Sequence, residues 1–326
     1  MSPTIRETDF STVDYEAIAA VLREVEPDDA RTVVELRERD ADFLEEGYDS
    51  TWLLAEENGE TVGIAQTGQM MSLGDGSIWL VSVDVRPPFA RRGIGALLQA
   101  AVEHLAIDRG GKTLWGNVRD DLPGSIRFAE HHGYRATDRD WRSTADLRTF
   151  DPRSWEPLLE SVAGRGIEIT SVAELRDQHV DWVERLHGLY TDIETDIPSS
   201  FSIQPIPEGL FRSQALESRQ ALLDGFFVAL DGDRWVGLTE VRSLQGEPTV
   251  LIQELTGVVF GSRRRGIATA LKVTGMAWAK EQGYASVRTF NAQSNTGMLA
   301  VNEALGFERG HGVVEYVKDL GGRVAS

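Results

Sequence analysis

The sequence predicts an α+β protein made of two copies of one unit, each a mixed, mostly antiparallel sheet flanked by helices. The first observation is a repeat, because Gly266 follows Gly93 and Phe307 follows Tyr134 at the same spacing (266 − 93 = 307 − 134 = 173). The second is a shared order of elements: a hairpin, a strand, a turn rich in arginine and glycine, and a helix. The length of 326 residues agrees with two domains.

Each copy begins its sheet with a β-hairpin. The stretches TWLLAEENGETVGIAQT and FFVALDGDRWVGLTEV place two short apolar runs around a turn, Asn58-Gly59 in the first copy and Asp231-Gly232 in the second. Asn-Gly and Asp-Gly favour the positive φ angles of tight hairpin turns. Another strand follows the hairpin in each copy, SIWLVSVDV in the first and TVLIQELTGV in the second.

Each copy then continues with a helix, a strand, a second helix and a closing strand. The first of these helices read GALLQAAVEHLAID and ATALKVTGMAWAKEQ, and the second end at Gly133 and Gly306. Between the copies, DPRSWEPLLESVAGRG has two prolines and ends on Gly-Arg-Gly, which favours a short helical linker. We therefore expect an N-terminal domain at 1–150, a linker at 151–164 and a C-terminal domain at 165–326.

The composition excludes several classes of function. The chain has no cysteine and six scattered histidines, which excludes disulfides and thiolate chemistry and predicts no metal site. A net charge of −19 argues against nucleic-acid binding and suits a cationic partner. No apolar run is long enough to span a membrane, and the N-terminus lacks the pattern of a signal peptide. We expect a cytoplasmic protein that binds neither nucleic acid nor membrane; the sequence leaves its oligomeric state open.

The arginine-glycine turn indicates an anion site. Where a strand ends and a helix begins, the first N–H groups of the helix lack partners and carry the positive end of the helix dipole. Gly93 and Gly95, or Gly266 and Ala268, let a phosphate approach the backbone, and arginines add charge. A lone turn of this kind is more often structural, but its duplication favours a pyrophosphate cradle. Neither copy has a P-loop or the three-glycine dinucleotide fingerprint.

This turn resembles the acyl-CoA pyrophosphate loop of the GNAT superfamily of N-acetyltransferases. The pattern Arg/Gln-x-x-Gly-x-Gly/Ala is met by Arg263, Gly266 and Ala268, and NTGMLAVNEALGF resembles the second motif, an Asn followed by a helix that ends in Leu-Gly-Phe. The resemblance covers almost the whole chain as two tandem GNAT domains. It implies acetyl-CoA as the acyl donor but does not specify the acceptor.

The resemblance also implies which residues contact acetyl-CoA. In the second copy they are Val258, Arg263, Arg264, Arg265, Gly266, Ile267, Ala268, Thr269, Asn295 and Asn302, and in the first copy Val85, Arg91, Arg92, Gly93, Ile94, Gly95 and Ala96. In this family the fourth strand splays from its neighbour. Such a splay would expose an N–H near Val258 to polarise the thioester carbonyl.

The same resemblance predicts Glu254 as the general base. An amine with a pKa near 10.4 is almost wholly protonated at neutral pH, so a group must accept its proton. The alternative is a structural carboxylate paired with a nearby arginine. The first copy has Val81, Leu122 and Ala90 where the second has Glu254, Asn295 and Arg263, which predicts that the C-terminal domain is catalytic and the N-terminal domain degenerate.

The general acid is less clear from the sequence. The family's thiolate-protonating tyrosine is absent, and Asn302 and Ala129 stand in its place. Asn302 donates hydrogen bonds but does not deliver a proton at useful rates. An unassisted thiolate and Tyr316 are the remaining candidates.

The acceptor region predicted for the second copy is acidic. LYTDIETDIPSSFSIQPIPEGLF places Asp192, Glu194 and Asp196 beside aromatic residues, which suits a cationic acceptor; a solvated acidic loop is the alternative. The leading interpretation is an N-acetyltransferase that moves an acetyl group from acetyl-CoA to a primary amine of a small cationic molecule. A non-catalytic acyl-CoA-binding or sensing protein is the alternative, and a third hypothesis has both copies active.

Overall fold

Two compact units make up the chain. The protein is described by a computed structural model that defines residues 3–27, 31–70 and 72–321. The first unit comprises Met1–Asp138 and Val314–Ser326, and the second comprises Arg139–Val313. The last part of the chain therefore belongs to the first unit, although it follows the second in sequence.

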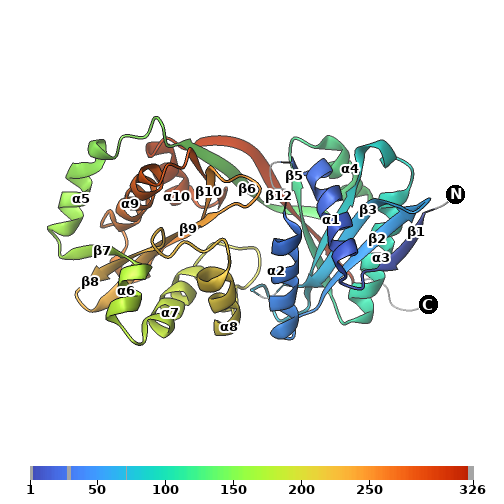
Figure 1. Ribbon diagram of the computed structural model, residues 1–326, viewed down its shortest axis with the longest axis horizontal. Coiled ribbons are helices and arrows are strands. Elements are labelled where there is room, and N and C mark those ends of the chain that lie inside the picture. The colour runs from blue at the N-terminus through green and yellow to red at the C-terminus, as the bar shows by residue number, and fades with distance from the viewer. Residues whose placement is uncertain (1–2, 28–30, 71, 322–326) are drawn as a thin grey trace. The chain divides into compact units, whose positions relative to one another are not determined.

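The sheet of the first unit has the strand order β1-β2-β3-β4-β5-β12 (Figure 1). Neighbours are antiparallel from β1 to β4, and β4 runs parallel to β5. The strands are β1 (Thr4–Glu7), β2 (Ser50–Glu57), β3 (Glu60–Gln69), β4 (Ile78–Val85), β5 (Thr113–Arg119) and the end of β12 (Glu308–Asp319). The expected hairpin is confirmed as β2 and β3, with Asn58 and Gly59 both at positive φ.

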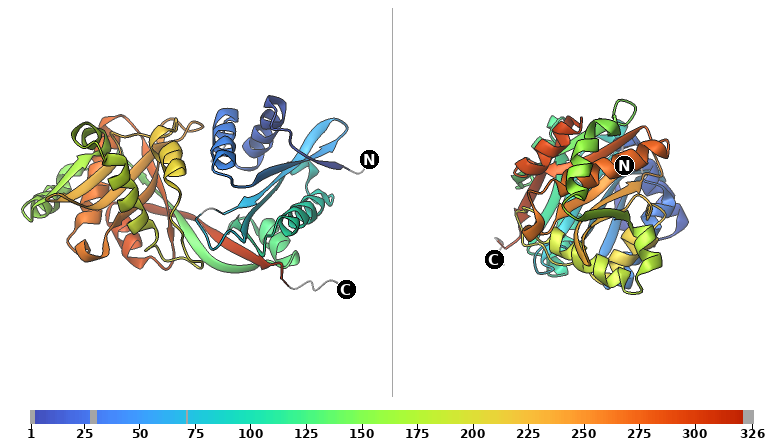
Figure 2. Two further views of the ribbon diagram at one scale, coloured as in Figure 1. Left: turned by 90° about the horizontal axis from the view of Figure 1, so that it is seen from below. Right: turned by 90° about the vertical axis from the view of Figure 1, so that its left-hand side faces the viewer.

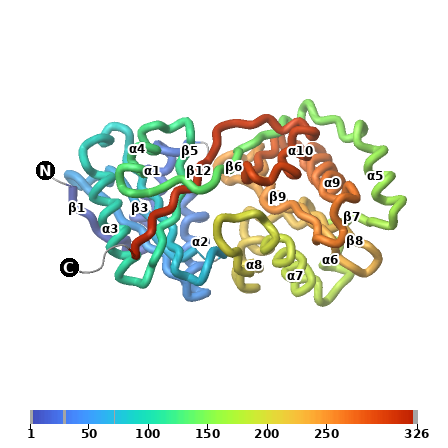
Figure 3. The backbone as a smooth tube through the Cα atoms, turned by 180° about the vertical axis from the view of Figure 1, so that it is seen from behind, coloured from blue at the N-terminus to red at the C-terminus, as the bar shows by residue number. Residues whose placement is uncertain are grey.

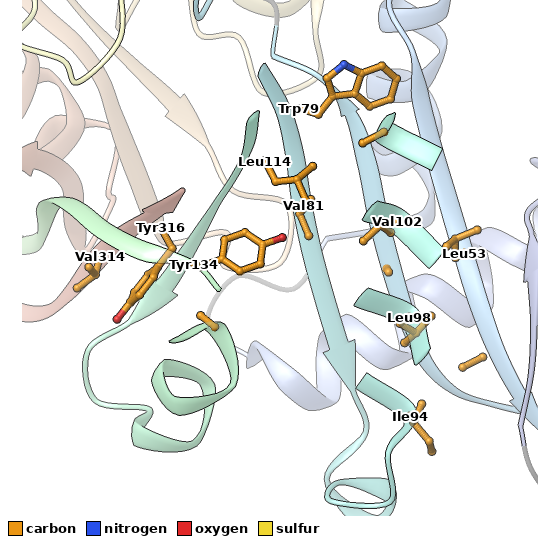
Figure 4. Close-up of a cluster of buried hydrophobic side chains, with 14 of the residues drawn as sticks. Leu53, Trp79, Val81, Ile94, Leu98, Val102, Leu114, Tyr134, Val314 and Tyr316 are labelled. Atoms are coloured by element: carbon orange, nitrogen blue, oxygen red, sulfur yellow. The ribbon is translucent and has the colours of Figure 1, made fainter. Parts of the chain in front are cut away.

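Helices cover both faces of this sheet. They are α1 (Thr12–Val25), α2 (Val33–Glu45), α3 (Ile94–Asp108) and α4 (Pro123–His131). Figure 2 shows α1 and α2 on one face and α3 on the other. Strand alternation supplies a core on each side: Leu54 and Ile64 pack with α1 and α2, whereas Leu53 and Ala65 pack with α3 (Figure 4).

The second unit repeats this architecture. Its strand order is β6-β11-β10-β9-β8-β7, with β10 parallel to β11. The strands are β7 (Ile167–Ser171), β8 (Phe227–Asp231), β9 (Arg234–Ser243), β10 (Val250–Val258), β11 (Ser286–Ala292) and the end of β6 (Arg135–Asp146). The helices are α5 (Glu156–Ala163), α6 (Val172–Gln178), α7 (Trp182–Glu194), α8 (Glu208–Phe211), α9 (Ile267–Glu281) and α10 (Thr296–Ala304). Helix α7 packs over β9 and β10 on one face, and α9 packs on the other.

The closing strands are exchanged between the two copies. Strand β6 ends the first copy, yet its residues Asp140–Asp146 pair with β11 of the second unit. Strand β12 ends the second copy, yet Val314 and Tyr316 pack in the core of the first unit, and Leu320 N–H donates to the Lys112 carbonyl at 2.8 Å. Figure 3 traces β12, in red, to its end among the elements of the first unit.

The compact units therefore differ from the expected boundaries of 1–150, 151–164 and 165–326. The difference has a physical reason, because a strand belongs to the sheet that satisfies its backbone hydrogen bonds rather than to the copy that encodes it. The expected linker is also part of the second unit. Its helix α5 packs Leu158, Leu159 and Val162 into the apolar cores beside α9.

Candidate active site

The arginine-glycine turn has the same backbone in both units. Arg91 and Gly93 have φ of 64° and 84°, and Arg264 and Gly266 have φ of 58° and 79°. These left-handed residues turn the chain sharply into α3 and α9, which begin at the next residue. The first helical bonds run to the carbonyls of Gly93 and Gly266. The backbone N–H groups that come before the first helical bond have no acceptor within the helix. Each turn therefore leaves these N–H groups available to bind an anion.

The arginines of the turn serve two different purposes. Arg92 pairs with Glu57 and Arg265 pairs with Asp231, both at 2.7 Å, so each brings the turn against the neighbouring hairpin. These two pairs stand at matching places in the repeat. The guanidinium groups of Arg91 and Arg264 are exposed instead. Among the predicted phosphate contacts, these two fit best.

Further interactions hold the arginine-glycine turn of the second unit in place. Arg263 forms an ion pair with Asp196, and its Nε donates to the Val258 carbonyl at 2.9 Å. Arg165 donates to the Arg265 carbonyl at 3.1 Å. A Cβ added at Gly266 would lie 3.0 Å from Leu158 of α5, so helix α5 packs closely against the turn. Arg165 and helix α5 therefore both help to fix the shape of the turn.

Beside each loop, two parallel strands separate. Pairing of β10 with β11 runs from Val250 to Gln253, and pairing of β4 with β5 runs from Ile78 to Leu80. Beyond these points β10 and β4 each continue for five residues, to Val258 and Val85. The splay expected from the resemblance is thus present in both units.

The open side of β10 presents the expected N–H. Val259 N–H donates to the Val236 carbonyl at 2.9 Å, so residue 259 bonds toward β9. In an antiparallel ladder the direction of these bonds alternates, and the N–H of Val258 therefore points away from β9, into the splay. The first unit repeats this arrangement, because Arg86 N–H donates to the Val62 carbonyl at 3.0 Å and turns Val85 outward.

Glu254 lies in a β-bulge of the second unit. Gln253 faces Val241 and Thr256 faces Thr239, so Glu254 and Leu255 together face a single residue of β9. The register of β4 against β3 is unbroken over the corresponding stretch. Glu254 is exposed, as a residue that must meet a substrate should be.

Because of the bulge, the residue of the second unit that corresponds to Val81 is not the one given by the constant spacing of the repeat. Gly63 and Gly237 hold the same place in the two hairpins, and counting along the ladders from them places Val81 at the register of Gln253. The spacing of 173 had matched Val81 with Glu254. Glu254 is an additional residue, while Val81 packs in the apolar core near Leu114 (Figure 4).

Glu240 of β9 and Glu254 of β10 face each other at the bulge, and Glu194 ends helix α7, which packs over both strands; we call these three residues the carboxylate cluster. Glu240 lies opposite the bulge, is 1 % exposed, and accepts a bond from Arg242 Nε at 2.5 Å. Burial raises the pKa of Tyr190 well above its ordinary value, and the charges of Glu240, Glu194 and Glu254 raise it further.

Burial also raises the pKa values of two members of this cluster. The pKa of Glu194 rises to about 7, and that of Glu240 also rises, with a further contribution from the charge of Glu254. The other acidic residues predicted near the acceptor differ, because Asp192 is exposed and Asp196 pairs with Arg263. Sequence reasoning missed Glu240. The sequence does contain a hint of its role, because Glu240 lies two residues after the apolar Leu238 and therefore on the same face of the strand.

The first unit fills the same face with bonded polar groups. Asp40 is 0 % exposed and accepts hydrogen bonds from the Tyr15 hydroxyl at 3.1 Å, Ser50 Oγ at 3.0 Å and Trp52 Nε1 at 2.8 Å. Gln66, which matches Glu240 in the hairpin, donates to Ser50 Oγ at 3.4 Å. This network holds α1 and α2 on the sheet.

Three further predicted or candidate residues have clear positions. Asn295 is the N-cap of α10, where its Oδ1 accepts from Met298 N–H at 3.2 Å. Asn302 is buried and donates to Asn291 Oδ1 at 2.5 Å. Tyr316 packs in the core of the first unit, so it is not one of the side chains of the second unit that surround Glu254.

Comparison with known proteins identifies the class. Residues 16–134 match the acetyltransferase (GNAT) family. The chain has the fold of a tandem GNAT protein, and the family match together with its curated relatives supports an acyltransferase.

Two curated relatives are mycothiol acetyltransferases. The chain is 28 % identical over 260 residues to a mycothiol acetyltransferase of Geodermatophilus obscurus, covering 77 % of each chain. It is 27 % identical over 247 residues to a mycothiol acetyltransferase of Salinispora arenicola, covering 72 % of each. The resemblance to the GNAT superfamily inferred from the sequence is confirmed.

Solved structures show the same fold over the full chain. A tandem GNAT protein from the clavulanic acid biosynthesis pathway superposes with a TM-score of 0.74 at 20 % identity, covering 98 % of this chain and 99 % of that one. A GCN5-related N-acetyltransferase from Sphaerobacter thermophilus gives 0.68 at 19 % identity, covering 97 % and 95 %. In the part of the chain that the structure describes, no helix is long and apolar enough to cross a membrane.

Proposed function

We propose that this protein transfers an acetyl group from acetyl-CoA to a primary amine of a small cationic molecule, and that the second unit performs the reaction. The observation that carries the proposal is the conjunction, in one unit, of an anion-binding turn, a splayed strand and a bulged, exposed Glu254. The first unit has the turn and the splay but not the bulge.

The donor would lie along the open edge of β10. Its pyrophosphate would accept bonds from the N–H groups at the start of α9, with the exposed Arg264 nearby. The thioester carbonyl would accept from the Val258 N–H that faces the splay. The residues present fit this ligand, since the loop shape is fixed by Arg263 and Arg265 before any phosphate arrives.

The acceptor amine would approach from the α7 side. Glu254 takes a proton from the ammonium, directly or through water, and the amine nitrogen attacks the thioester carbon. The C–S bond breaks, CoA leaves as a thiolate, and the thiolate takes up the second proton that the nitrogen releases. The carboxylate cluster attracts a protonated amine to this face. Glu240, which lies opposite the bulge that carries Glu254, contributes to that attraction.

Exchange of Glu254 for Gln tests the role of the base. The Glu254→Gln protein should lose roughly tenfold or more in kcat, because the amide accepts no proton at useful rates. Titration calorimetry should show almost unchanged affinity for acetyl-CoA. Equal loss of turnover and of acetyl-CoA affinity would show that Glu254 has a structural role and would count against the assignment.

A non-catalytic acyl-CoA-binding role suits the first unit alone. Its turn repeats the φ angles of the second, and Val85 N–H points into its splay. It has Gln66 where the second unit has Glu240 and no bulged carboxylate on β4. We infer that the first unit can bind CoA but does not catalyse transfer.

A further inference from the structure

Lys272 of α9 carries a buried amine without a polar partner in the part of the chain that the structure describes. The residue is 1 % exposed, and among the described residues its Nζ forms no hydrogen bond and no ion pair. The Nζ lies 4.9 Å from the centre of the Phe307 ring, and burial alone lowers the pKa of this amine to about 7. Burying an amine without an acceptor reduces stability, so a position that keeps one is a candidate for binding or catalysis.

The first unit satisfies the same position internally. Gln99 stands at the matching place of the repeat (272 − 99 = 173) and is 2 % exposed. Its Nε2 donates to the Tyr134 hydroxyl at 2.8 Å, whereas Phe307, which matches Tyr134, has no side-chain oxygen. The fold thus accommodates a bonded polar pair here, yet within the described part of the second unit the amine is left unbonded.

The level of Lys272 along the sheet follows from its neighbour in α9. Leu271 packs against β9, since a Cβ added at Gly237 would lie 3.2 Å from the Leu271 side chain. Gly237 faces Val258 across the β9–β10 ladder. Lys272 follows Leu271 directly and therefore lies near the level of Val258. Pairing of β10 with β11 ends at Gln253, so this level is inside the splay.

The Lys272 side chain leaves α9 on the side of the open edge of β10. Leu271 faces β9, and residue 272 is turned about 100° from it around the helix axis. Met276 lies four residues further on, on the same side of α9 as Lys272. Met276 packs in a core with Leu251 of β10 and Val287 of β11, which are paired residues. This side of α9 therefore covers the boundary between β10 and β11, where the strands separate.

Helix α10 supplies no acid at this place. Its Asn302 stands where the family has the tyrosine, and the Asn302 side chain donates to Asn291 Oδ1 at 2.5 Å. Lys272 reaches the same helix end, because Phe307, the ring beside the amine, donates its backbone N–H to the Asn302 carbonyl at 3.0 Å. The amine thus brings a proton-bearing group from α9 to the α10 side of the splay.

We propose that Lys272 contacts the CoA sulfur at the open edge of β10 and supplies its proton. As the C–S bond breaks, the ammonium gives a proton to the sulfur and becomes a neutral amine. This amine then takes up, through water, the second proton that the acceptor nitrogen releases. The inference rests on the proposed function, because it assigns a second catalytic residue to the same reaction.

The sulfur suits this amine better than the pyrophosphate does. The pyrophosphate would lie at the start of α9 by Gly266, about 9 Å along the helix from Lys272. The thiolate, in contrast, forms in the splay, where the Val258 N–H would hold the thioester carbonyl. An amine with a pKa of about 7 both gives and regains a proton at neutral pH.

A binding experiment tests the contact with sulfur without turnover. Calorimetric titration compares CoA with desulfo-CoA, in which hydrogen replaces the thiol group. The native protein should bind CoA roughly tenfold more tightly, because the thiol and the amine share a proton in a charge-assisted hydrogen bond. In Lys272→Met, which keeps an unbranched side chain without the charge, this preference should fall toward one.

Turnover gives a second readout. Lys272→Met should lower kcat with acetyl-CoA by roughly tenfold or more and leave KM for the amine nearly unchanged. Lys272→Gln, which carries the residue of the first unit, should lose as much, so a folding defect in one variant does not decide the result. Gln99→Met makes the matched change in the first unit and should keep the native kcat and the native CoA preference.

The outcomes separate this inference from the proposed function. Native kcat in both Lys272 variants, or a lower kcat with an unchanged CoA preference, would overturn the role of Lys272 and leave the acetyltransferase intact. A native protein that does not distinguish CoA from desulfo-CoA would also contradict the contact with sulfur. A native protein that acetylates no amine would contradict the proposed function, whereas a CoA preference abolished in Lys272→Met would still show that Lys272 contacts the sulfur.

Discussion

The same face of the sheet is used in opposite ways by the two units. In the first, Asp40 is buried and receives three hydrogen bonds from side chains of its own unit. In the second, Glu240 is equally buried but keeps one oxygen without a partner among the described residues. Asp40 accepts hydrogen bonds on both oxygens and so stabilises the fold, whereas Glu240 is bonded to Arg242 through one oxygen and leaves the other available to a ligand. The comparison therefore assigns stability to one face and recognition to the other.

The fourth strands of the two sheets differ by one added residue. The bulge in β10 leaves Glu254 exposed, while the regular β4 keeps Val81 in the core. A one-residue insertion changes which side chains face outward without rebuilding the sheet. The catalytic difference that we propose between the copies therefore comes from the strand register as well as from the residue types.

Deletion of Glu254 should have the largest effect. It removes the base and restores the unbulged register that the first unit already tolerates, so kcat should fall by about 10²–10⁴ while the protein stays folded. Steady-state kinetics and circular dichroism check both parts. Retained turnover in a folded deletion variant would show that the bulge is not needed.

Buried carboxylates of the two units should respond differently to removal. Asp40→Ala leaves three donors without their acceptor and should lower the free energy of unfolding by about 3–5 kcal/mol. Glu240→Gln keeps a side-chain oxygen that can accept from Arg242 but removes the charge that pairs with it, so it should lower the free energy of unfolding by less than Asp40→Ala does. Urea unfolding measures both variants. A Glu240→Gln loss as large as that of Asp40→Ala would contradict the division into stability and recognition.

The two units also differ at a buried pair of side chains, and this difference should make the stability of the second unit depend on pH. Lys272 Nζ lies 4.9 Å from the centre of the Phe307 ring, where the first unit has Gln99 hydrogen-bonded to the Tyr134 hydroxyl at 2.8 Å. Burial lowers the pKa of Lys272 to about 7. Between this value and its unfolded pKa near 10.4, the unfolded chain holds the proton and the folded chain does not, so stability should rise with pH across that window.

The Lys272→Gln, Phe307→Tyr double variant installs the pair of the first unit. It should be more stable than the native protein by about 1–3 kcal/mol at pH 7, with a smaller gain at pH 10. Urea unfolding at both pH values measures the difference. A pH-independent difference would show that the Lys272 amine does not change its protonation on folding.

The smallest expected effect concerns Glu194. Its pKa is raised to about 7 by burial, so the folded protein holds a proton that the unfolded chain releases near pH 4.3, and stability falls as pH rises between these values. Because the side chain is partly exposed, its contribution is discounted to about 1 kcal/mol. Glu194→Gln should therefore raise Tm at pH 8 by about 2–4 °C and have little effect at pH 4. An equal shift at both pH values would contradict this.

Much of the fold followed from the sequence because its signals are local. The Asn58-Gly59 hairpin, the arginine-glycine turn and the helix ends at Gly133 and Gly306 are set by residues close together in the chain. The exchange of β6 and β12 was missed, since two closing strands of one repeat have the same pattern and either sheet accepts either strand. The bulge at Glu254 was missed because a constant spacing of 173 conceals a shift that only cross-strand pairing shows.

The central claim is that the cradle of the second unit serves catalysis and that of the first does not. Thr269 and Ala96 hold matching third positions of α9 and α3, where a glutamate folds back onto the free N–H groups and repels a phosphate without opposing the helix. Acetyl transfer should be measured in Thr269→Glu and Ala96→Glu, with calorimetric titration of acetyl-CoA. The account predicts that turnover is lost in Thr269→Glu and kept in Ala96→Glu. Turnover that survives Thr269→Glu but is lost in Ala96→Glu would contradict it.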